Sequence, residues 1–167
     1  MSASLPLDHT PPDRYRWLRL AAAALALGGL GYLLAAGWPV LFPVAEYAAA
    51  APPACDLQRG PCSARIDAAH AIDLEIEPKV ITPVQPVRLF VNLHGIDADR
   101  VEVEFSGVEM NMGRISDELL DTGSGSFTGD ATLPICVRRQ MSWQALITAH
   151  AADGRYRGTF RFEVNRP

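Results

Sequence analysis

The chain has 167 residues and a formal net charge of -4, from 15 basic and 19 acidic residues. A net negative charge, with Lys79 as the single lysine and no basic run, excludes a surface that tracks nucleic-acid phosphates. Hydrophobic residues make up 49% of the chain and are concentrated near the N-terminus. The length and this uneven distribution predict one folded domain plus an accessory apolar segment.

The accessory segment is an apolar run, because no charged residue occurs between Leu20 and Ala45. A membrane-spanning helix needs about 20 predominantly apolar residues, so this run is long enough to cross a bilayer. Arginines precede it, and the positive-inside rule then predicts a cytoplasmic N-terminus and an exported remainder. We therefore expect a cytoplasmic tail at 1–16 and a transmembrane anchor at 17–44. A cleaved signal peptide is the alternative, although its apolar core is typically about 7–15 residues long.

Residues 45–70 are rich in alanine and proline and predict a linker that carries two cysteines. Cys55 and Cys62 flank a short loop with a Gly-Pro pair, and in an oxidising compartment such cysteines most simply form a local disulfide. Their spacing fits neither a CxxC redox motif nor a zinc knuckle. A disulfide between Cys136 and one of these two cysteines remains the other pairing.

From Ala71 onward, apolar and polar residues alternate with a period of two, which is typical of half-buried β-strands. Turn signals rich in glycine, proline and aspartate separate the runs. About seven short strands, with no convincing helix, predict an all-β, immunoglobulin-like β-sandwich over residues 71–167, preceded by one N-terminal transmembrane helix. The expected strands comprise residues 72–77, 87–93, 101–105, 114–120, 127–133, 141–149 and 157–164.

Two of the four methionines, Met110 and Met112, stand two residues apart between Gly107 and Gly113. In an extended chain such residues point to the same face, and thioether sulfur is a soft ligand that suits Cu(I). Alternation continued from Phe105 would turn both methionines outward, where core packing does not explain them. A bulge at Gly107 would instead turn them inward, as gap-filling core residues.

A second group of sulfur atoms follows the fifth expected strand. Cys136 and Met141 flank a short loop and could face each other across it, and Trp143 shares a strand face with Met141. If the other two cysteines pair, Cys136 is either a free thiol or a buried, inert one. Trp143 is either a core residue, which we favour, or a shield over a bound cation. The predicted Cu(I) ligands are Met110, Met112, Cys136 and Met141, with Trp143 in the shielding role.

The sequence lacks the motifs of the common enzyme classes. It contains no nucleophile elbow, no HExxH motif and no glycine-rich phosphate loop before a helix. Carboxylates such as Asp73, Glu75, Glu102 and Glu104 alternate with apolar residues, so they lie on solvated strand faces. We therefore expect a protein without enzymatic activity.

The chain resembles the YtkA-like or FixH-like periplasmic domains in four features. These are an N-terminal anchor, an exported sandwich, the Met-x-Met-Gly stretch ending at Gly113 and the Phe-x-Phe-x-Val strand at Phe160–Val164. The resemblance covers roughly residues 72–164, one domain length. It implies a bacterial inner-membrane protein whose periplasmic domain binds Cu(I) and assists copper delivery to, or assembly of, a haem–copper oxidase. Cys136 and Trp143 are not part of that family's pattern. The alternative is a metal-free interaction module that scaffolds a membrane complex, with the methionines as an adaptable contact patch.

Overall fold

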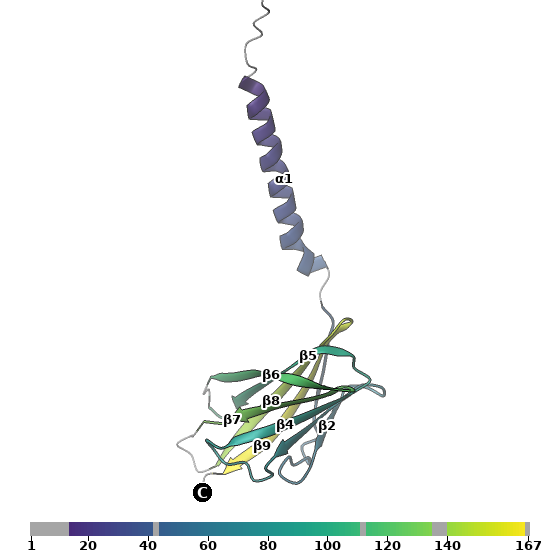
Figure 1. Cartoon of the computed structure of the whole chain (residues 1–167), viewed down its shortest axis with the longest axis vertical. Helices are drawn as coiled ribbons and strands as arrows, with labels where there is room; N and C mark the ends of the chain where they lie inside the picture. Colours follow the sequence, from purple (N-terminus) through teal and green to yellow (C-terminus); the bar gives the residue numbers. More distant parts are fainter. Residues whose placement is uncertain (1–13, 42–43, 111–112, 135–139, 166–167) are drawn as a thin grey trace, which may run out of the picture. The chain divides into compact units, whose positions relative to one another are not determined.

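The computed structural model describes residues 14–41, 44–110, 113–134 and 140–165, and the chain divides into two units, Met1–Pro43 and Val44–Pro167. In the first unit, α1 (Arg14–Leu41) is one apolar helix filled largely by alanine and leucine, which are strong helix formers (Figure 1). Its segment Tyr15–Gly37 is long and apolar enough to cross a membrane. The expected N-terminal apolar helix is therefore present.

The described part of the second unit is all-β, which confirms the expected fold class. Its nine strands form one continuous sheet in the order β1-β9-β8-β5-β6-β7-β4-β3-β2. The strands are β1 (Glu46–Ala50), β2 (Cys62–Arg65), β3 (Ala71–Glu77), β4 (Pro86–His94), β5 (Ala98–Gly107), β6 (Arg114–Gly123), β7 (Ser126–Thr132), β8 (Gln140–Ala151) and β9 (Gly154–Asn165).

Strand β6 passes from one layer of the sandwich to the other. Its first part pairs with β5 as far as Leu119, whereas its second part pairs with β7 from Leu120 onward. One layer therefore contains β1, β9, β8 and β5, and the other contains β7, β4, β3 and β2. Their inward side chains form one core, to which β3, β4, β5, β8 and β9 each contribute alternate buried residues. Because β2 and β9 also approach each other, the sheet nearly closes into a barrel.

The segment 45–70, which the sequence assigned to a linker, belongs to the folded unit, and this expectation is corrected. Strand β1 pairs in parallel with β9, and β2 pairs antiparallel with β3. Leu57, between the two cysteines, is fully buried in the core. The pattern gave no strand at β1 because its alanines have a low strand propensity, so tertiary pairing rather than local preference makes this strand.

Candidate functional site

The two described members of the predicted sulfur set, Met110 and Met141, lie near the point where β5 ends and β8 begins. In the ladder between these strands, Gly107 lies opposite Trp143. Just beyond it, the N–H of Val108 donates a hydrogen bond of 3.0 Å to the carbonyl oxygen of Ser142. The start of the methionine-bearing loop is therefore held against the start of β8.

Met141 and Trp143 point into the core from β8. Their exposed fractions are only 3% and 2%, because the two residues share the inward face of the strand. Trp143 pairs in register with Phe162, whose ring makes an edge-to-face contact with Phe105 at a centroid distance of 6.3 Å. Trp143 thus has the core position that we favoured from the sequence, and a metal-shielding role stays a prediction.

Met110 follows β5 in the loop and is 37% exposed. Its carbonyl oxygen lies 2.6 Å from the position that a Cβ atom on Gly107 would take, and the Cε atom of Met141 lies 2.5 Å from that same position. The two methionines therefore approach one glycine, Met110 from the loop and Met141 from the core. The missing side chain at Gly107 is what allows this approach.

The two remaining predicted ligands, Met112 and Cys136, lie outside the described residues. The other two, Met110 and Met141, are among the described residues, and each offers a thioether sulfur, which suits Cu(I). Within residues 14–41, 44–110, 113–134 and 140–165, no group of three or more His, Cys, Asp or Glu side chains is placed to hold a metal ion. Thioether sulfur suits Cu(I) better than the hard ions calcium and magnesium, which take oxygen ligands.

The cysteines near the N-terminus of the folded unit form a disulfide. The sulfur atoms of Cys55 and Cys62 are 1.96 Å apart, and the Cα atoms are 5.7 Å apart. This is the local pairing that the short loop predicted. Cys136 therefore takes no part in that bridge, and the other pairing considered from the sequence is excluded.

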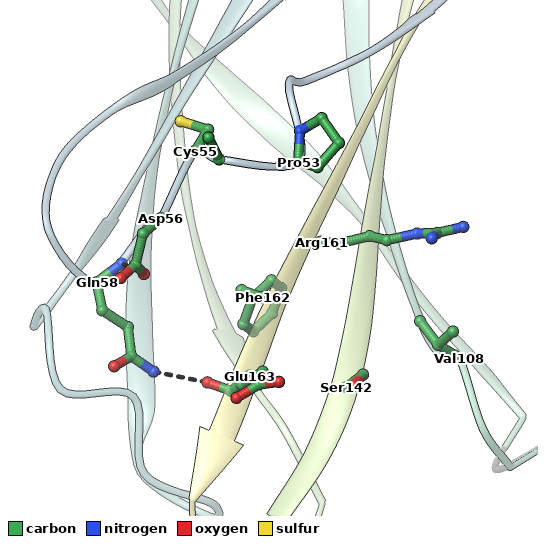
Figure 2. Close-up of a pocket in the computed structure, with 10 residues that line it drawn as sticks. Pro53, Cys55, Asp56, Gln58, Val108, Ser142, Arg161, Phe162 and Glu163 are labelled. Atoms are coloured by element: carbon green, nitrogen blue, oxygen red, sulfur yellow. Dashed lines mark hydrogen bonds between the residues drawn. The ribbon is translucent and has the colours of Figure 1, made fainter.

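A cleft of about 440 Å³, which the sequence did not predict, lies beside the C-terminal half of β9 (Figure 2). Pro53 and Asp56, close to Cys55, line one part of the cleft, Arg161 and Glu163 of β9 line a second, and Val108 and Ser142 line a third. The side-chain amide of Gln58 crosses toward the strand and donates a hydrogen bond of 2.6 Å to the carbonyl oxygen of Glu163 (Figure 2). The sequence signal for a gap at this place was the Pro-Pro pair at 52–53, because residues without an N–H group cannot continue the hydrogen-bonded ladder of a strand.

A polar cluster lies far from the cleft, where β8 ends and β9 begins. The Asp67 carboxylate lies 2.7 Å from Nδ1 of His70, and this hydrogen bond, with bonds from backbone N–H groups, lowers the pKa of Asp67. The hydroxyl of Tyr156 donates to Asp153 at 2.6 Å, which raises the pKa of Tyr156 to about 12. Tyr47 stacks on Tyr156 at a centroid distance of 4.8 Å. The cluster ties β1 and the loop at residues 66–70 to β9.

No family model matches this chain, and no curated protein matches its sequence. Among solved structures, it is similar to a DUF4785 family protein from Legionella pneumophila subsp. pneumophila str. Philadelphia 1, with 16% identity and a TM-score of 0.45. That match covers 59% of this chain and 29% of the Legionella chain. It is also similar to an engineered protein, with 18% identity and a TM-score of 0.39, over 56% of this chain and 20% of that one. This chain thus spans less than a third of either structure.

Proposed function

We propose that this chain is a membrane-anchored periplasmic β-sandwich protein that binds Cu(I) through sulfur ligands and assists copper delivery to, or assembly of, a haem–copper oxidase. The observation that supports the proposal is the approach of Met110 and Met141 to the same glycine. The backbone of Met110, in the loop after β5, and the side chain of Met141, on β8, thereby lie at the same end of the sandwich. A packing role alone explains Met141, but it does not explain an exposed Met110 in a loop.

The proposed ligands divide by their position in the chain. Met110 and Met112 lie in the loop between β5 and β6, and Cys136 lies between β7 and β8. Met141, the second residue of β8, would donate from the core side. Thioether donors would leave the ion exchangeable, which suits a carrier, and a thiolate from Cys136 would tighten the binding.

The test is Cu(I) binding by the full-length chain in detergent micelles, measured anaerobically under reducing conditions by competition with a chromophoric chelator. Mass spectrometry on the same sample reports the stoichiometry. Replacing Met110 and Met112 together with leucine conserves volume but removes both sulfurs, so the fold should persist while copper binding is lost. Leu120→Val, on the exposed face of β6, is the matched control and should bind as the wild type does.

Each result has a definite reading. Stoichiometric binding that is lost in the double variant and kept in the control supports the copper carrier. A chain that takes no Cu(I) from the chelator overturns the proposal, as does a double variant that binds as tightly as the wild type. Met141→Leu then separates the roles of the core methionine, because packing survives that exchange and ligation does not.

A further inference from the structure

Strand β6 leaves a groove beside β7 where it passes from one layer to the other. It pairs with β5 as far as Leu119 and with β7 from Leu120, which lies opposite Thr128. Gly129 permits this crossing, because a Cβ atom on it would lie only 2.6 Å from the Cδ2 methyl group of Leu119. Beyond Gly129, β7 keeps β4 on one side but has no described strand on the other. The result is a groove of about 460 Å³, which residues of β4, β6 and β7 line.

The middle of this groove is apolar. Phe90 of β4 and Leu120 of β6 both lie opposite Thr128, one on each side of it. Phe90 faces outward, because its neighbours Leu89 and Val91 are both buried in the core. It is half-buried, and Leu120 is 72% exposed. The two side chains therefore form an apolar centre on the outer face of the layer, which a partner could remove from water.

The charge around this apolar centre is negative. The lining contains three carboxylates, those of Asp117, Glu118 and Asp130, and one guanidinium group, that of Arg88. Arg88 pairs with Asp130 at 3.1 Å, so these two charges compensate each other. Asp117 and Glu118 are exposed, and neither forms an ion pair within the described parts of the chain. On β3, Glu77 lies opposite Arg88 and is likewise exposed without an ion pair to any described residue.

The open shape and the charge of the groove exclude most classes of occupant. Small molecules are held in cavities that cover most of their surface, whereas Leu120 stands largely in water. Nucleic acids and anionic membranes would be repelled by the unpaired carboxylates. A second copy of the chain also carries a net charge of -4, so it approaches against electrostatic repulsion. A protein segment with positive charge complements the groove.

We propose that this groove binds a basic segment of a partner protein. An apolar side chain of the segment would lie against Phe90 and Leu120. Its arginine or lysine side chains would pair with Asp117 and Glu118. Burial of the apolar side chain would supply most of the affinity, whereas the exposed ion pairs would select basic partners and speed their encounter. The proposal does not depend on copper binding, because none of the proposed copper ligands lines the groove.

The test follows leucine methyl groups by NMR, with the full-length chain in nanodiscs of phosphatidylcholine. This lipid carries no net charge, so it offers a basic probe no electrostatic attraction. The probe is the acetylated and amidated peptide Ser-Arg-Ile-Ser-Lys-Ser. Its addition should shift the methyl signals of Leu119 and Leu120, which line the groove, in a saturable way. The methyl signals of Leu57, in the disulfide loop, should stay in place and report that the fold is intact.

Two control peptides separate the sources of recognition. A peptide with glutamate in place of both basic residues should cause no shift at the same concentration. A peptide with serine in place of isoleucine should bind about fivefold more weakly or worse, because it has no apolar side chain to bury.

Variants of the groove test the same two sources, with the Leu119 methyl signals as the reporter. Leu120→Ser should weaken binding of the basic peptide by about fivefold or more. Asp117→Asn combined with Glu118→Gln should weaken it by roughly two- to tenfold, as expected for two exposed ion pairs, and high salt should reduce this difference. Asp97→Asn, at an exposed carboxylate outside the groove, is the control and should bind as the wild type does.

Saturable shifts that require both the basic and the apolar residues of the peptide support the proposal. It is overturned if the basic peptide causes no shift, or if the acidic peptide shifts the same signals. Binding as tight as that of the wild type in both Leu120→Ser and the double variant would place the peptide elsewhere and would also overturn it. Shifts at Leu119 that grow with protein concentration without peptide would identify a second copy as the occupant, against the proposal.

Discussion

The terminal methyl group of Met141 lies 2.5 Å from the position that a Cβ atom on Gly107 would take. The carbonyl oxygen of Met110 lies 2.6 Å from the same position, on the loop side. Real Cβ atoms essentially never approach other atoms this closely, so any side chain at Gly107 would force one neighbour to move. The methionine can move because its end is flexible, whereas the backbone carbonyl cannot do so without shifting the loop.

Gly107→Ala should therefore destabilise the folded unit by about 1–3 kcal/mol, the usual cost of inserting a methyl group into a packed site. The measurement is urea unfolding followed by circular dichroism. Gly60→Ala is the matched control, because a Cβ atom there would meet nothing within 4 Å. That exchange should be neutral or slightly stabilising. Equal midpoints for Gly107→Ala and the wild type would show that the loop yields easily and that Gly107 is dispensable.

Much of the fold could be predicted because alternation with a period of two is a local property of the sequence. Each of the seven expected strands overlaps one of β3 to β9, and the apolar helix is present. Alternation also indicates which side chains point inward, as the buried Val101 and Val103 illustrate. Strands β1 and β2 were missed because they are short. The alanine-rich β1 has five residues and β2 has four, which is too few to show a clear alternation.

The candidate site was harder to predict because it depends on which strands are neighbours. The pairing of Gly107 with Trp143 joins residues far apart in the chain, and no local pattern fixes that register. The sequence left open whether Met110 points outward or into the core, and the structure has it 37% exposed, whereas Trp143 is the core residue that we favoured. The cleft beside β9 depends on the packing of residues 53–58 against that strand, which joins segments far apart in the sequence.

Leu57 provides a test of how firmly the disulfide loop belongs to the core. Its side chain is completely buried, although it lies between the two cysteines in a segment without regular structure. Leu57→Ala should cost about 2–5 kcal/mol, because it removes a buried side chain and leaves a cavity. Leu120→Ala, at a side chain that is 72% exposed, should change stability by no more than about 0.5 kcal/mol. Similar urea midpoints for the two variants would mean that the loop is not an integral part of the core.

Tyr156 should titrate at unusually high pH. Its hydrogen bond to Asp153 stabilises the neutral phenol and, with burial, raises the pKa from the ordinary 10.0 to about 12. The corresponding stability is fully present below pH 10 and is lost as the pH rises through about 12. Absorbance of the tyrosinate ion measures this directly. The step near pH 12 should vanish in Tyr156→Phe and move to lower pH in Asp153→Asn; an unchanged step in Tyr156→Phe would assign it to another tyrosine.

Asp67 gives the opposite dependence on pH. The hydrogen bond from His70 is the largest cause of its lowered pKa, followed by bonds from the N–H groups of Ala69 and His70. The folded state therefore favours the carboxylate. Its contribution to stability is present above the ordinary pKa of 3.8 and is lost as the pH falls through the lower folded value.

Asp67→Asn isolates this charge, because the amide oxygen can still accept from the two backbone N–H groups. The variant should be less stable than the wild type near pH 7, and the difference should shrink as the pH falls below 3.8, where the wild-type carboxylate takes up its proton. Urea midpoints measured from pH 7 to strongly acidic pH test this. Asp97→Asn, at an exposed carboxylate, is the control and should follow the wild type. A difference between Asp67→Asn and the wild type that stays constant at every pH would mean that the amide disturbs the turn itself, and that the charge of Asp67 contributes nothing.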